Sequence, residues 1–124
     1  MSVAAAIRIT SPDEARVIEH AAAFAKQQAE SCFIISVVPS LPYGAMNDEE
    51  QTNVTRNLNL IMESQCAPVM QVGDDVAQTL LTVARGFGIR TLFLQNGTSR
   101  GRSIAEQLLY LDPPFDVVVV GNSA

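Results

Sequence analysis

Tryptophan is absent from this chain of 124 residues, histidine occurs once and cysteine twice. Basic side chains are also scarce: Lys26 is the only lysine, and 8 basic residues against 13 acidic ones give a net charge of −5. Nucleic-acid binding needs a basic face that neutralises phosphates, so this balance argues against a DNA or RNA partner. No apolar run approaches the roughly 20 residues of a membrane span, and we expect a soluble chain without a membrane partner.

The two cysteines, Cys32 and Cys66, are too few for a disulfide framework and lack CxxC spacing. Both are predicted to be small buried hydrophobes in a reducing compartment. Residues 1–6 have neither a basic start nor a long apolar body, so they look like a first strand rather than a secretion signal. The expected location is therefore cytoplasmic.

Residues that could carry catalysis are few. The sequence places no partner for a general-base role beside His20, which is predicted to be an exposed bystander in the middle of a helix. There is no cluster of metal-binding residues, no Ser-His-Asp constellation and no phosphate-binding fingerprint. We therefore expect no metal and favour a protein that is not an enzyme, with weak ATP hydrolysis as a poorer alternative.

Apolar runs alternate with helical patterns along the whole chain, which we take as one domain, 1–124. Strands are predicted at 3–9, 32–38, 68–72, 91–94 and 115–120. Helices are predicted to begin at four capping residues, each followed by apolar residues at helical spacing. The capping residues are Ser11 (with Glu14), Asn47 (with Glu50), Asp74 and Ser103 (with Glu106).

This alternation implies right-handed βαβ units, hence a doubly wound α/β fold with a five-stranded parallel sheet and helices on both faces. The unbroken apolar run 32–38 indicates a central strand buried on both faces. Pro68 cannot donate a ladder hydrogen bond, so the strand that contains it is predicted to lie at a sheet edge.

Ligands of such sheets bind beyond the carboxyl ends of the strands, where the strand order reverses. If the first and fourth strands are neighbours, Thr10 and Ser11 face the loop 95–103 across that cleft. This loop holds glycines, hydroxyls and two arginines at a helix start, which suits a phosphate or another anion. The candidate ligand-binding residues are Thr10, Ser11, Val38, Gly97, Ser99, Arg100, Gly101, Arg102 and Ser103.

The same residues have a purely structural interpretation. Gly97 and Gly101 can serve a tight turn, Arg100 and Arg102 can be solvated, and Ser11 and Ser103 can simply cap helices. Caps occur at helix starts with or without a ligand.

Several motifs resemble the universal stress protein family over nearly the full length. Ser11-Pro12 followed by the alanine-rich helix is similar to the family's first helix, and the segment 73–77 with Gly88-Ile89 is similar to its third helix and fourth strand. The last strand, 115–120, looks like the stress-protein domain of Kdp-type potassium-sensing histidine kinases. The resemblance implies the adenine nucleotide alpha-hydrolase-like fold, with strand order 3-2-1-4-5.

Two functional hypotheses follow from these residues and this resemblance. The first is a regulatory domain that binds an adenine nucleotide or another anionic metabolite, with ATP, AMP and cyclic dinucleotides as candidates. Nucleotide-binding members have an aspartate at the end of the first strand, where this chain has Ile9-Thr10, and their phosphate loop is longer. The alternative is a ligand-free dimerisation or signalling module, a homodimer whose interface is Val117, Val118, Val119 and Val120.

Overall fold

The computed structural model describes residues 1–38, 46–95 and 104–121. Strands and helices alternate along these residues, as the sequence predicts. The elements are β1 (Ser2–Ile7), α1 (Ala15–Gln28), β2 (Ser31–Val38), α2 (Asp48–Glu63), β3 (Ala67–Val72), α3 (Val76–Gly86), β4 (Ile89–Gln95), α4 (Ile104–Tyr110) and β5 (Asp116–Val120). Within the described ranges, no helix combines the length and apolar character needed to cross a bilayer.

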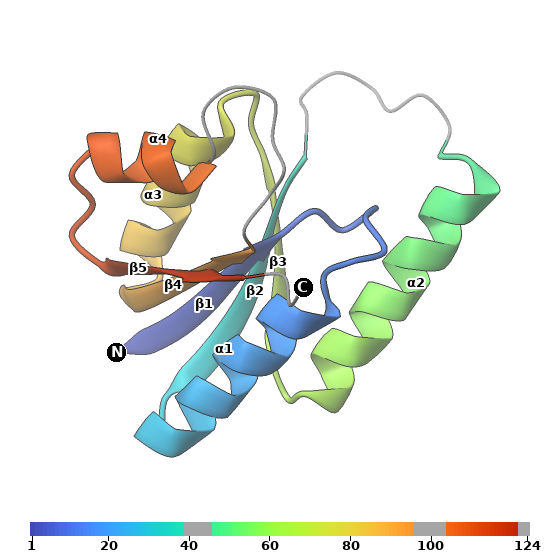
Figure 1. Cartoon of the computed structure of the whole chain (residues 1–124), viewed down its shortest axis with the longest axis horizontal. Helices are drawn as coiled ribbons and strands as arrows, with labels where there is room; N and C mark the ends of the chain where they lie inside the picture. Colours follow the sequence, from blue (N-terminus) through green and yellow to red (C-terminus); the bar gives the residue numbers. More distant parts are fainter. Residues whose placement is uncertain (39–45, 96–103, 122–124) are drawn as a thin grey trace.

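The five strands form one parallel sheet in the order β3-β2-β1-β4-β5 (Figure 1). β1 lies in the middle, pairing Ile7 with Ser36 of β2 and Ala6 with Leu94 of β4. This confirms the expected order 3-2-1-4-5 and the expected contact between the first and fourth strands. It also confirms the edge position of the strand that contains Pro68.

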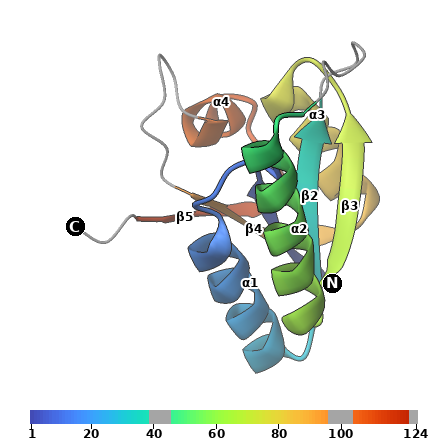
Figure 2. The ribbon, with the colours of Figure 1, turned by 90° about the vertical axis from the view of Figure 1, so that its right-hand side faces the viewer.

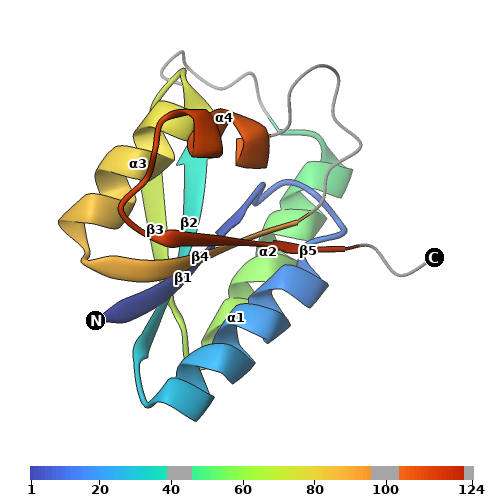
Figure 3. The ribbon, with the colours of Figure 1, turned by 60° about the vertical axis from the view of Figure 1, so that its left-hand side comes forward.

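Helices cover both faces of the sheet. α1 and α2 lie side by side on one face (Figure 2), and α3 and α4 cover the other (Figure 3). The side chains of β1 alternate between the two layers: Val3, Ala5 and Ile7 join the core beneath α1 and α2, whereas Ala4 joins the core beneath α3 and α4. This period of two follows from the strand geometry and explains why the strands read as unbroken apolar runs.

Two helix starts differ in how well the sequence predicts them. Asn47 caps α2 as expected: its side chain accepts a hydrogen bond from the Glu50 amide at 2.7 Å, and the Glu50 carboxylate accepts one from the Asn47 amide at 3.2 Å. The cap of α3 is Asp75, not Asp74, because the Asp75 carboxylate accepts a hydrogen bond from the Gln78 amide at 3.1 Å.

The expected cap of the first helix is wrong. α1 begins at Ala15, with Glu14 at the cap position and no side-chain cap bond, so Ser11 does not begin the helix. The physical reason is a turn, in which the Ser11 amide donates to the Arg8 carbonyl at 2.9 Å. Residues 8–14 are therefore a separate connection, called the β1–α1 loop below. Ser103, the expected cap of α4, lies outside the described residues.

Candidate functional site

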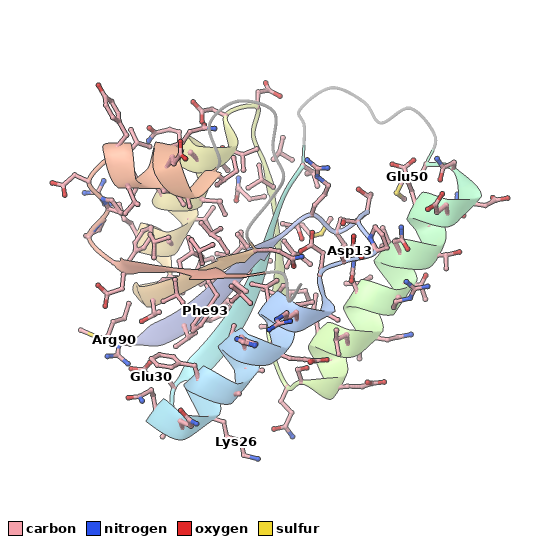
Figure 4. The ribbon with its side chains drawn as sticks, viewed as in Figure 1. Asp13, Lys26, Glu30, Glu50, Arg90 and Phe93 are labelled. Carbon is pink, nitrogen blue, oxygen red and sulfur yellow. The ribbon has the colours of Figure 1, made fainter. Side chains whose placement is uncertain are left out.

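The carboxyl ends of β1, β2 and β4 lie next to one another at one end of the sheet. The strand order reverses here, because β2 and β3 lie on one side of β1 while β4 and β5 lie on the other. Figure 4 shows Asp13 and Glu50 at this end, and the Arg90–Glu30 ion pair, at 3.0 Å, at the opposite end. The position is the one at which open α/β sheets bind ligands.

Three of the sequence-predicted site residues fall at this end of the sheet. Thr10 and Ser11 lie half-buried in the β1–α1 loop, and Val38 is the buried last residue of β2. The Val38 carbonyl accepts a hydrogen bond from the Gly73 amide at 2.8 Å, which ties the end of β2 to the turn before α3. The other predicted residues, Gly97, Ser99, Arg100, Gly101, Arg102 and Ser103, lie outside the described residues.

Two asparagines of α2 hold the β1–α1 loop in place. The side-chain amide of Asn57 donates to the Ile9 carbonyl at 2.8 Å and to the Ser11 carbonyl at 3.0 Å. The side-chain amide of Asn53 donates to the Thr10 carbonyl at 3.0 Å. Both asparagines are buried, so three successive carbonyls are satisfied by one helix rather than by water.

Sequence reasoning missed both asparagines, although a signal was present. Asn53, Asn57 and Ile61 recur at intervals of four, which places them on one face of a helix. All three are buried in the structure, with Ile61 in the core beneath α1 and α2. Polar residues within the buried stripe of an amphipathic helix indicate specific hydrogen-bond partners, because burying an amide without a partner is costly.

Glu14, in the β1–α1 loop, is a further buried polar residue. Its carboxylate accepts a hydrogen bond from the Arg8 amide at 3.2 Å. The residue as a whole is only 8% exposed. Burial raises the pKa of the Glu14 carboxyl above its ordinary value, although the hydrogen bond from the Arg8 backbone and the Arg8 charge act in the opposite direction. The position of the carboxyl therefore disfavours its charged form, which loses contact with water.

Replacing Glu14 with glutamine should remove a pH-dependent part of the stability. A carboxyl whose pKa is raised on folding binds protons more strongly in the folded state, so stability is lost as pH rises through the folded pKa. The glutamine oxygen can still accept the bond from the Arg8 amide. Urea unfolding from pH 4 upward, in steps of about half a unit, should show wild type losing stability relative to Glu14→Gln above about pH 4.5.

The matched control is Glu19→Gln, which changes an exposed carboxyl on α1. Its stability profile should run parallel to that of wild type. Parallel profiles for Glu14→Gln and wild type over the whole range would instead show that burial of Glu14 does not shift its protonation on folding.

Acidic residues lie at the starts of α1 and α2. Asp13 precedes α1, and Asp48, Glu49 and Glu50 form the first turn of α2. These charges complement the helix dipoles but repel an incoming anion. In the described part of the chain, no three His, Cys, Asp or Glu side chains come together as metal ligands.

No protein-family model matches the chain, and no curated protein matches it in sequence. Solved structures do match in fold. A universal stress protein in complex with cAMP aligns with a TM-score of 0.72 and 14% identity, over 98% of each chain. The universal stress protein of Archaeoglobus fulgidus in complex with dAMP aligns with a TM-score of 0.66 and 17% identity, over 96% of each chain.

A third match is a protein of the universal stress protein family from Burkholderia pseudomallei, with a TM-score of 0.64 and 20% identity, over 96% of this chain and 95% of that one. The chain therefore has the fold of the universal stress proteins, as its sequence motifs indicate.

Proposed function

We propose that this chain is a regulatory domain of the universal stress protein type that binds an adenine nucleotide, or a related anionic metabolite, at the β1/β4 cleft. The observation that carries the proposal is the adjacency of β1 and β4 at the point where strand order reverses. The β1–α1 loop on one side of that point is fixed by Asn53 and Asn57, so this wall of the site is preorganised.

Similar structures support the class of ligand. Two of them hold dAMP or cAMP, and both share the fold of this chain over nearly its whole length. In our proposal the base lies near Thr10, Ser11 and Val38, and the phosphate lies toward Arg100 and Gly101. ATP, AMP and cyclic dinucleotides are the candidates to test beside cAMP.

Titration with these nucleotides tests the proposal. Calorimetry or thermal-shift titration of wild type should reveal saturable binding of at least one of them. Arg100→Ala should weaken that binding about tenfold or more, because a hydrogen bond between charged groups is lost. The matched control is Arg85→Ala, which removes the same charge from the exposed last turn of α3 and should leave the affinity unchanged.

Absence of binding by every nucleotide, at concentrations up to about 1 mM, would contradict the proposal. If Arg100→Ala and Arg85→Ala lowered the nucleotide affinity equally, nucleotide binding would stand, but the phosphate would not lie at Arg100.

A second candidate function is dimerisation through β5. β5 is an edge strand on which Val118 and Val119 are 37% and 46% exposed, and Leu109 and Tyr110 of α4 are also exposed. Edge strands with exposed apolar side chains favour pairing with another chain. Of the other predicted interface residues, Val117 is half-buried and Val120 belongs to the core of its own chain.

The dimer predicts a difference between the two edges of the sheet. Light scattering should give twice the monomer mass for wild type, and Val119→Lys should give a monomer because a charge would be buried at the strand pair. Val72→Lys makes the same change on the opposite edge strand, where Val72 is 55% exposed, and should remain dimeric. A monomeric wild type would remove this candidate.

Finer assignments rest on the sequence alone. The likeness of residues 115–120 to Kdp-type histidine kinases, the cytoplasmic location and a role in stress signalling remain predictions. In our proposal, ligand binding or dimerisation is the signal that a partner protein detects.

A further inference from the structure

The two cysteines lie opposite each other at the start of the β2–β3 strand pair. Phe33 of β2 pairs with Ala67 of β3, and Cys32 and Cys66 are the residues immediately before them. In a parallel pair, residues at the same register position project to the same face. Continuing the register by one step therefore places the two thiols side by side.

The packing of both side chains agrees with this position. Cys32 and Cys66 are each 8% exposed and belong to the same core cluster, beneath α1 and α2, together with Ile61. Both are free thiols. They are at the opposite end of β2 from Val38, the residue nearest the proposed ligand site.

Their chemical environments differ. The Cys66 Sγ donates a weak hydrogen bond to the Ser64 carbonyl at 3.6 Å. A hydrogen bond from the Cys32 thiol lowers the pKa of Cys66, while the same contact, followed by burial, raises the pKa of Cys32. The contact between the two thiols therefore favours a thiolate on Cys66 over one on Cys32.

We propose that Cys32 and Cys66 form a reversible disulfide when the protein meets a hydroperoxide, with Cys66 as the attacking thiol and Cys32 as the resolving thiol. This modification site is independent of the proposed nucleotide site.

The reaction proceeds in two steps. The Cys66 thiolate attacks one peroxide oxygen, so that an S–O bond forms, the O–O bond breaks, and the departing hydroxide takes up a proton to become water. The Cys32 sulfur then displaces the hydroxyl of the Cys66 sulfenic acid, so that an S–S bond forms and a second water leaves with the Cys32 proton. Two thiols are oxidised by two electrons, and one hydrogen peroxide is reduced to two waters.

The strand geometry accommodates the bond. Neighbouring strands lie about 4.8 Å apart, which falls within the Cα separations of disulfides. The Cβ atoms must approach to about 3.8 Å, a movement of roughly 1 Å. β3 can move by this distance because it is an edge strand. Cys66 also lies in the connection before β3 rather than within the paired region.

Mass spectrometry of the full chain tests the proposal. After treatment with a small excess of hydrogen peroxide and alkylation under denaturing conditions, wild type should lose about two mass units and take up no alkylating reagent. Dithiothreitol should restore both thiols. With dimedone, a sulfenic-acid trap, Cys32→Ala should give an adduct on Cys66, whereas Cys66→Ala should give none at the same dose.

The wild-type result does not depend on the folding of either variant. Retention of two alkylatable thiols, a gain of oxygen atoms without a disulfide, or covalent links only between chains would each overturn the proposal. An adduct on Cys32 in Cys66→Ala, with none in Cys32→Ala, would overturn the assignment of the attacking thiol.

Discussion

Replacing Asn57 with leucine should lower the free energy of unfolding by about 2–4 kcal/mol. Leucine is similar in size but removes the amide that donates to the Ile9 and Ser11 carbonyls at 2.8 and 3.0 Å. Asn57 is 2% exposed, so water cannot readily replace these bonds. The cost of unsatisfied buried carbonyls should therefore exceed the gain from burying an apolar side chain.

Urea unfolding measures this effect, and Asn59→Leu is its matched control. Asn59 lies on the same helix but is exposed, so its replacement should change stability by no more than about 0.5 kcal/mol. Amide hydrogen exchange should also become faster at Ser11, whose N–H bonds to the Arg8 carbonyl. Equal effects of the two leucine variants would contradict the role assigned to Asn57.

Replacing Gly73 with alanine should destabilise the protein by about 1–3 kcal/mol. A Cβ atom at this position would overlap with Oγ1 of Thr79 and lie 2.9 Å from its Cγ2, and Thr79 lies in the first turns of α3. The turn has little freedom to yield, because the Gly73 amide bonds to the Val38 carbonyl at 2.8 Å. The substitution should therefore displace the end of β2, one wall of the proposed site.

Gly86→Ala provides the opposite expectation. Gly86 is the last residue of α3, and a Cβ atom there meets nothing within 4 Å. Because alanine loses less entropy in a helix, this variant should be more stable than wild type by about 0.5–1 kcal/mol. Thermal unfolding of the two variants tests both expectations. If Gly73→Ala were as stable as Gly86→Ala, the Thr79 side chain would move aside without loss of stability, which would contradict the first expectation.

The fold could be predicted from the sequence because its signals are local and agree with one another. The apolar run 32–38 and the helical period from Val76 to Phe87 each define an element within one short segment. Pro68 places its strand at an edge through its missing N–H. The strand order came from the family resemblance, since alternation alone permits several parallel orders.

The candidate site was predicted less completely, because its geometry depends on contacts between distant segments. Asn57 and Ile9, which are hydrogen-bonded, are 48 residues apart in the sequence. No local pattern in the β1–α1 loop predicts that bond. The cap at Asn47 was predictable, since both partners lie within four residues. The cap predicted at Ser11 does not form. The Ser11 amide bonds to the Arg8 carbonyl and the Ser11 carbonyl accepts a bond from Asn57 of α2, and these contacts override the local capping preference.

The most direct test of a ligand site between β1 and β4 is an NMR titration of the labelled protein with cAMP and AMP. We predict that amide shifts will concentrate at Thr10, Ser11 and Gln95, at the carboxyl ends of β1 and β4. Glu30 and Arg90, at the opposite end of the sheet, should not move. No shift with either nucleotide, or shifts centred on Glu30 and Arg90, would contradict the account.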